Sequence, residues 1–187
     1  MGCSPNTSPC ISPMTELKDI PDDVKWRIAA RCASTLPAMY DLAFRSTMGK
    51  EFDGLEQEIW LNLARIMVPG IVRDLSLPIR NAHELAQSIQ IVMALLFGPD
   101  YSGETLDVSE DGAVMLVKRC PFVNYGCSMG AKRDHLFSKC MALTLTAIPV
   151  LNRKYSARYV RTLCTGDRQC EIKVEIIRKP EEGKKQD

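Results

Sequence analysis

The sequence lacks most of the features that place a protein in a class at first sight. Only 6% of its 187 residues are aromatic, and only two are histidine. Its longest uninterrupted apolar run, Ile91–Gly98, is far shorter than the roughly 18 residues that a membrane-spanning helix needs. The N-terminus has no positively charged segment followed by an apolar one, so it does not resemble a secretory signal. We therefore expect a cytoplasmic protein that does not bind a membrane.

Motifs for nucleotides and nucleic acids are missing as well. No glycine-rich loop of the Walker or dinucleotide-binding type occurs in the sequence. The chain does have a basic part, residues 118–168, with 10 Lys and Arg against two acids, whereas residues 1–117 have 9 against 16. This basic part has no recognition-helix signature, zinc-finger spacing or RNA-binding aromatic motif. We therefore expect no nucleic-acid partner. The basic part is expected either to stabilise thiolates and attract anionic ligands or to pack on the acidic N-terminal half.

The spacing of apolar residues and the positions of proline predict a helical N-terminal half. Residues 1–13 contain three prolines and are expected to form a flexible lead, followed by helices in residues 14–98. Pro21 suits the start of a helix, Pro37 predicts a break, and Asn81 suits a helix cap. The helix expected over residues 52–67 has an apolar stripe that indicates a core face or the lining of a ligand pocket; the stripe is Leu55, Ile59, Leu63 and Ile66.

After Gly98 the apolar residues alternate as they do in strands. Residues 99–179 are predicted to form a ββ-α-ββ antiparallel sheet unit, with a tail at 180–187. The Asp-Gly pair at 111–112 is typical of a hairpin turn, and the central helix is expected over residues 134–148. The fold class predicted from the sequence is therefore α+β, with the helical half and the sheet unit forming one compact domain.

Cysteine is the residue that this sequence has in excess, with eight in 187. In a cytoplasmic chain a group of cysteines more often binds a metal or acts in catalysis than forms disulfides, although free cysteines also serve as small buried apolar residues. The predicted strands and helix bring five of them towards one end of the sheet: Cys120, Cys127, Cys140, Cys164 and Cys170. Four thiolates can hold either zinc or an iron–sulfur cluster. The short C-x₂-C spacing of common zinc sites is missing, so the choice between metal binding and burial stays open.

The stretch from Arg158 to Val174, RYVRTLCTGDRQCEIKV, resembles the C-terminal signature of 4-vinyl-reductase-type small-molecule-binding domains. It is also similar to that of the L-2-amino-thiazoline-4-carboxylic acid hydrolase-like proteins. The resemblance implies a domain that holds a small, often ring-containing ligand between sheet and helices. For zinc-containing members it implies metal ligands at Cys140, Cys164 and Cys170. The acidic ligand of that pattern is replaced by Arg161, so Cys120 or Cys127 would have to supply the fourth ligand.

Two functions follow as hypotheses from these observations. The first is a small-molecule-binding protein, a sensor or cofactor-handling protein, with a cysteine-ligated zinc or iron–sulfur centre. The alternative is a thiol-dependent hydrolase of a small cyclic substrate, in which Cys127 is the nucleophile because Lys132 and Arg133 follow its glycine-flanked loop. His135 would then be the general base. The oligomeric state is left open, with a homodimer as one possibility.

Overall fold

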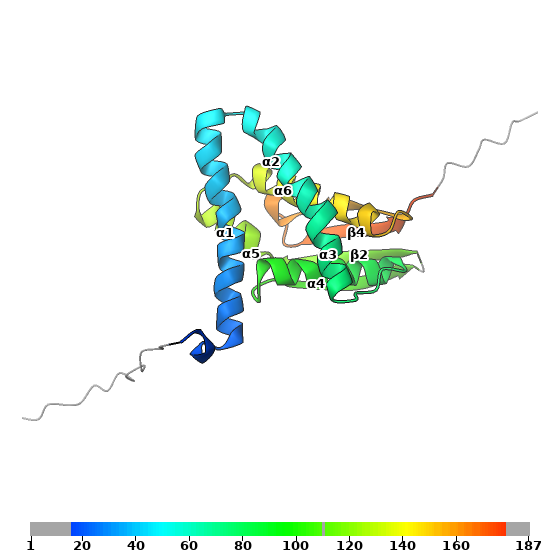
Figure 1. The fold of residues 1–187 in the computed structure, drawn as a ribbon. Coiled ribbons are helices and arrows are strands. Elements are labelled where there is room, and N and C mark those ends of the chain that lie inside the picture. The colour runs from blue at the N-terminus through cyan, green and yellow to red at the C-terminus, as the bar shows by residue number, and fades with distance from the viewer. Residues whose placement is uncertain (1–15, 110, 179–187) are drawn as a thin grey trace, which may run out of the picture.

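The computed structural model describes residues 16–109 and 111–178, and the fold is α+β, as the sequence predicts (Figure 1). The flexible lead expected at residues 1–13 and the tail expected at residues 180–187 lie outside the described residues, as do residues 14, 15, 110 and 179. The described elements are η1 (Leu17–Asp19), α1 (Asp22–Met48), α2 (Glu51–Asn62), the π-helical segment η2 (Leu63–Met67), α3 (Val68–Asp74), α4 (Ala82–Phe97), β1 (Ser102–Ser109), β2 (Gly112–Arg119), α5 (Pro121–Ser128), α6 (Arg133–Leu151), β3 (Tyr155–Arg161), η3 (Leu163–Thr165) and β4 (Cys170–Ile176).

The four strands form one antiparallel sheet in the order β1-β2-β4-β3. Along β4, Cys170, Ile172 and Val174 are buried and alternate with more exposed charged residues, as a half-buried strand requires. In the register of β2 against β4, Val117 lies opposite Cys170. The end of β2 and the start of β4 therefore meet at one end of the sheet.

Helices α4 and α6 cover one face of the sheet, and the core lies between them and the strands (Figure 1). The opposite face has a different chemistry, because oppositely charged side chains pair along and across its strands. These pairs are Lys118–Glu104, Arg158–Glu175, Lys173–Glu175 and Arg161–Glu171. A sheet with one apolar and one charged face is typical of a two-layer antiparallel fold.

Helix α1 runs without interruption through Pro37, where the sequence predicts a break. Packing explains the difference, since a buried stripe of small residues, Ala30, Ser34 and Ala38, holds α1 against the other helices. That contact offsets the loss of one backbone hydrogen bond at proline. α1 also passes close to Gly98 at the end of α4, where a Cβ atom would lie only 2.5 Å from the Cβ atom of Ala30.

The segment α2–η2–α3 buries a different stripe from the one that the sequence predicts. Its buried residues recur every four positions and are Phe52, Glu56, Trp60, Ala64, Val68 and Val72. Leu55, Ile59 and Ile66 of the predicted stripe are more than half exposed. A glutamate among the buried residues hides this pattern in the sequence, because a charged residue is rarely buried unless it is paired.

The glycine-flanked loop expected around Cys127 is instead mostly helical, since residues 121–128 form the short helix α5. Gly126 allows α5 to pack closely on α6, because a Cβ atom there would lie 2.7 Å from Cδ2 of Leu136. Among the helices of residues 16–109 and 111–178, none combines the length and the apolar character needed to cross a membrane.

Candidate functional site

Five cysteines gather at the end of the sheet where β2 and β3 finish and β4 begins; we call Cys120, Cys127, Cys140, Cys164 and Cys170 the thiol cluster. The sequence predicts this grouping, and the structure also makes their environments clear. Cys120, Cys164 and Cys170 are buried, while Cys127 and Cys140 are partly buried as residues. None of the six cysteines in the described part of the chain is in a disulfide.

Each sulfur with a polar contact in the thiol cluster has a neutral partner. Sγ of Cys140 lies 2.9 Å from the Oη of Tyr159, and that hydroxyl also donates to Oγ1 of Thr144 at 3.1 Å. Sγ of Cys170 accepts from the backbone N–H of Leu163 at 3.4 Å. These contacts direct the sulfurs towards separate hydroxyl and amide groups.

Burial raises the pKa of four thiols in the cluster. The pKa of Cys140 rises to about 12 and that of Cys164 to about 11, and the pKa values of Cys120 and Cys170 rise as well. Removal from water disfavours the charged thiolate. At neutral pH these thiols are therefore protonated and pack as small, weakly polar groups.

The prediction of a cysteine-ligated zinc or iron–sulfur centre is wrong. In residues 16–109 and 111–178, no group of three or more His, Cys, Asp or Glu side chains is arranged to hold a metal ion. The physical reason is that Cys140 and Cys170 face hydrogen-bonding partners of their own rather than one shared point. Metal binding would require four ligand atoms around a single position.

The two residues proposed for a hydrolase do not lie in the same hollow. Cys127 lines a shallow hollow together with Lys132, Arg133 and Cys164. His135 lines another groove, where its Nδ1 lies 3.5 Å from a carboxylate oxygen of Asp41. The arrangement therefore gives no support to a thiol and an imidazole acting together, which would need a shared hydrogen bond.

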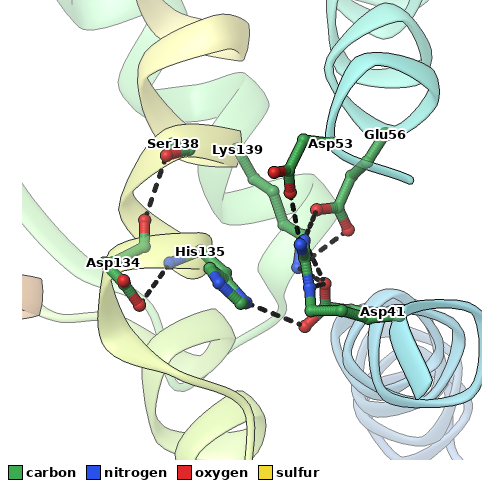
Figure 2. A network of polar contacts seen from close by, with 8 residues as sticks. Asp41, Asp53, Glu56, Asp134, His135, Ser138 and Lys139 are labelled. Carbon is green, nitrogen blue, oxygen red and sulfur yellow. Dashed lines mark hydrogen bonds and ion pairs between the residues drawn. The ribbon is translucent and has the colours of Figure 1, made fainter. Parts of the chain in front are cut away.

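A second polar cluster, which the sequence analysis did not find, ties α1, α2 and α6 together (Figure 2). We call it the ion network, and it consists of Asp41, Arg45, Asp53, Glu56, His135 and Lys139. Two pairs arise from helical spacing, because residues four apart face the same side of a helix. In this way α1 presents Asp41 with Arg45, and α6 presents His135 with Lys139.

Arg45 and Lys139 connect the carboxylates of the ion network. Arg45 donates to Oδ1 of Asp41 at 2.9 Å and to Oε2 of Glu56 at 3.1 Å, and it also pairs with Asp53. Nζ of Lys139 lies 2.9 Å from Oε1 of Glu56 and 3.6 Å from Oδ1 of Asp41. Arg45 thus links α1 to α2, and Lys139 links α6 to both, so the network fixes the α1–α2 pair onto α6.

The centre of the network is removed from water, since the side chains of Asp41 and Lys139 are each 1% exposed, whereas Asp53 at its edge is 57% exposed. Burial opposes ionisation of Asp41, but the hydrogen bond from Arg45 and the charge of Lys139 outweigh it, so the pKa of Asp41 is lowered. For Glu56 the effect of burial prevails over the contact with Lys139, and its pKa is raised. Two carboxyl groups of one cluster therefore differ in the direction of their shifts.

A groove between α2 and α6 opens onto this network, and we call it the polar groove. Its volume is about 680 Å³, and the wall away from the network is apolar, with Trp60, Leu61 and Met141. A smaller hollow of about 300 Å³, the apolar groove, lies between α1, α2 and α4. Glu56 and Trp60 line both of them. The apolar groove is lined by Ala33, Pro37, Tyr40, Phe52, Glu56, Ile59, Trp60, Leu63, Met67, Leu96 and Phe97.

Comparison with known proteins shows a fold but no family. No protein-family model and no curated protein matches the chain. Among solved structures, the chain is similar to the crystal structure of a trafficking protein particle complex subunit 3 from Naegleria fowleri, covalently bound to palmitic acid. The TM-score is 0.56 and the identity is 14%, over 78% of this chain and 95% of that one. This likeness establishes a shared fold, and the neighbour's ligand is a lipid rather than a metal or a hydrolase substrate.

Proposed function

We propose that this chain binds the hydrocarbon chain of a lipid in the apolar groove and acts as one subunit of a larger assembly. The observation that carries the proposal is the lining of the groove, where ten of the eleven residues are apolar or aromatic and only Glu56 is charged. Ligand sites are generally concave and mostly apolar with few polar groups. The solved structure of the same fold holds palmitic acid, which supports a lipid as the ligand class.

The apolar lining of the groove makes burial of a hydrocarbon chain favourable in free energy. Each buried methylene contributes about 0.8 kcal/mol, so eight of them contribute roughly 6 kcal/mol before the cost of immobilising the ligand. The described residues that line the groove include no cysteine. We therefore propose non-covalent binding, unlike the covalent attachment of palmitic acid in the neighbour.

Titration of the purified chain with palmitate, followed by calorimetry, tests this proposal. Ala33→Trp places an indole in the apolar groove and is expected to weaken palmitate binding by about tenfold or more. Ala43→Trp is the matched control, because Ala43 is exposed on the same helix and does not line the groove. Equal binding by both variants and the unmodified chain would contradict the apolar groove as the site.

The outer surface of α1 supports a protein partner, and we propose a second copy of this chain. Six large apolar side chains outside the apolar groove are between 39% and 58% exposed on this one helix: Trp26, Ile28, Leu36, Met39, Leu42 and Phe44. A helix that is apolar on most of its faces usually has neighbours on those faces. Light scattering during gel filtration should give a dimer mass that Met39→Glu converts to a monomer; a monomer at all concentrations would exclude self-association.

A further inference from the structure

The sheet has an open edge along β1. Among the described strands, β1 pairs with β2 only, because the strand order is β1-β2-β4-β3. Irregularities of register lie between Ser102 and Gly103 and between Asp107 and Ser109, so Gly103–Asp107 is the regular part of this edge. In residues 16–109 and 111–178, the backbone hydrogen bonds made outside helices and strands include none from Gly103–Asp107. A regular edge of this kind presents unpaired N–H and C=O groups to another extended chain.

The contacts of Gln90 show which backbone groups point outward. Its Nε2 donates to the carbonyl oxygens of Glu104 and Leu116, each at 3.1 Å, and these two residues lie opposite each other in β1 and β2. One amide nitrogen can reach both oxygens only if both lie between the two strands. Residues along an antiparallel strand alternate between facing the partner strand and facing away from it. The N–H and C=O groups of Thr105 therefore face the open side, as do those of the residues two positions before and after it.

A hollow beside this edge has room for the side chains of an added strand. It lies between α4 and β1, has a volume of about 440 Å³, and is lined by Gly103 and Thr105 together with the polar side chain of Gln87. On the other face of the strand, Leu106 is 46% exposed and lies opposite the half-buried Val114. Because the side chains of a strand point alternately to its two faces, an added strand would place polar side chains in the hollow and apolar ones beside Leu106.

The charge around the edge restricts the sequence that can bind there. Residues 81–117, which include α4, β1 and most of β2, contain six Asp and Glu but no Lys or Arg. The side chain of Asp107 is 71% exposed at one end of the hollow, where its Oδ1 lies 2.6 Å from Nδ1 of His83. The side chain of Glu104 is 45% exposed and pairs with Lys118. Acids outnumber basic residues in this region, so a basic segment is complementary to the edge.

We propose that β1 binds a basic segment of a partner protein, which pairs with Gly103–Asp107 as an additional strand of the sheet. The backbone of the segment occupies the open side of β1, and its Lys or Arg side chains lie in the hollow and reach the carboxylate of Asp107. Its alternate apolar side chains pack beside Leu106 on the other face. The hollow and the apolar groove have no lining residue in common, so this inference does not depend on the proposed lipid site.

A heptapeptide of alternating Lys and Val, titrated into the full chain and followed by NMR, tests the proposal. We expect binding to slow the exchange of the amide hydrogens of Gly103, Thr105 and Asp107 with solvent, because these amides then donate to the peptide. The same peptide with every backbone nitrogen methylated keeps its charge but loses its donors, and should bind about tenfold more weakly. A peptide of alternating Glu and Val should also bind about tenfold more weakly, because its charge has the wrong sign.

Two substitutions locate the contact on the protein. Asp107→Lys reverses the charge at the end of the hollow and should weaken binding of the Lys-Val peptide about tenfold, whereas Asp23→Lys, at an exposed position on α1, should not. Equal binding of the methylated peptide or of the Glu-Val peptide would overturn the proposal. Slowed exchange along Tyr155–Arg161 instead of Gly103–Asp107 would place the peptide on β3, the other edge of the sheet, and would also refute it.

Discussion

The thiol cluster and the ion network are both buried groups of polar side chains, yet they are stabilised in opposite ways. In the thiol cluster, Cys140 and Tyr159 are neutral, and burial keeps the thiol protonated. In the ion network, Asp41 and Lys139 are almost completely buried and their charges depend on each other. Loss of one partner is therefore tolerable in the first region and costly in the second.

This difference shows that the residue type that stands out in a sequence need not mark the region where burial of side chains is most costly in free energy. A group of cysteines attracts attention in the sequence, but its members pack as small side chains around hydroxyl groups. The ion network uses common residues spread from position 41 to position 139. Only the fold brings them together, and within residues 16–109 and 111–178 the buried charged side chains are those of Asp41, Glu56 and Lys139.

The largest effect that separates the two regions is expected from Lys139→Met. This change keeps the side-chain volume but removes the more deeply buried of the two cations, Lys139 and Arg45, that Asp41 and Glu56 share, and breaking a buried ion pair typically costs about 3–5 kcal/mol. Urea denaturation should show a fall in the free energy of unfolding of that size. Lys132→Met, at an exposed position just before the same helix, is the control; similar small losses in both variants would contradict a buried network.

The next effect concerns acid stability. The pKa of Asp41 in the folded chain is lowered from its ordinary value of 3.8. The stability that ionised Asp41 contributes is therefore fully present above pH 3.8 and is lost as the pH falls through the lowered pKa. Glu56 has the opposite effect, because its raised pKa means that the protonated carboxyl favours the folded state. This contribution to stability is present at low pH and is lost as the pH rises. The stability difference between the unmodified chain and Asp41→Asn should therefore shrink below pH 3.8.

Chemical denaturation at pH 3 and pH 7 measures this change. Asp23→Asn, which affects an exposed carboxylate on α1, provides the comparison. A stability difference for Asp41→Asn that is the same at both pH values would show that the charge of Asp41 makes no contribution in the folded state.

The smallest effect is expected in the thiol cluster. Tyr159→Phe removes the hydroxyl that joins Cys140 to Thr144, and loss of such neutral hydrogen bonds costs about 1 kcal/mol. Tyr125→Phe removes an exposed hydroxyl 3.3 Å from Asp100 and should change stability by less. If Tyr159→Phe were as damaging as Lys139→Met, the contrast between the two regions would fail.

The fold was more accessible from the sequence than the site. Alternation along residues 170–176 and the Asp-Gly turn at 111–112 were sufficient for the antiparallel hairpins, because these signals are local. The cap predicted at Asn81 is confirmed, with its side chain accepting from the N–H of Glu84 at 2.8 Å. The break predicted at Pro37 is wrong, because packing of α1 against the other helices outweighs the tendency of proline to interrupt a helix.

The ion network could not be predicted, because its members contact each other across three helices. The pairs Asp41–Arg45 and His135–Lys139 have the spacing of a shared helix face, but such pairs usually lie on exposed surfaces. Nothing in the sequence indicates that Lys139 is buried. The sequence predicts that the cysteines gather, but its prediction of a metal centre is wrong. The direction of a thiol such as that of Cys140 depends on a hydroxyl partner elsewhere in the chain, which the spacing of cysteines does not reveal.

The π-helical segment η2 has a consequence for how this chain can vary in length. Buried residues spaced four apart from Phe52 to Val72 would drift by about 40° per step in a regular α-helix, and the wider turn of η2 corrects part of this drift. A π turn is equivalent to one inserted residue. Deleting one residue from 63–67 would therefore restore a regular helix and leave Val68 and Val72 facing the core, whereas a deletion in the regular part of α2 would rotate them by about 100°. The irregular turn is thus the place in this helix where the chain can lose one residue without changing the face that α3 buries.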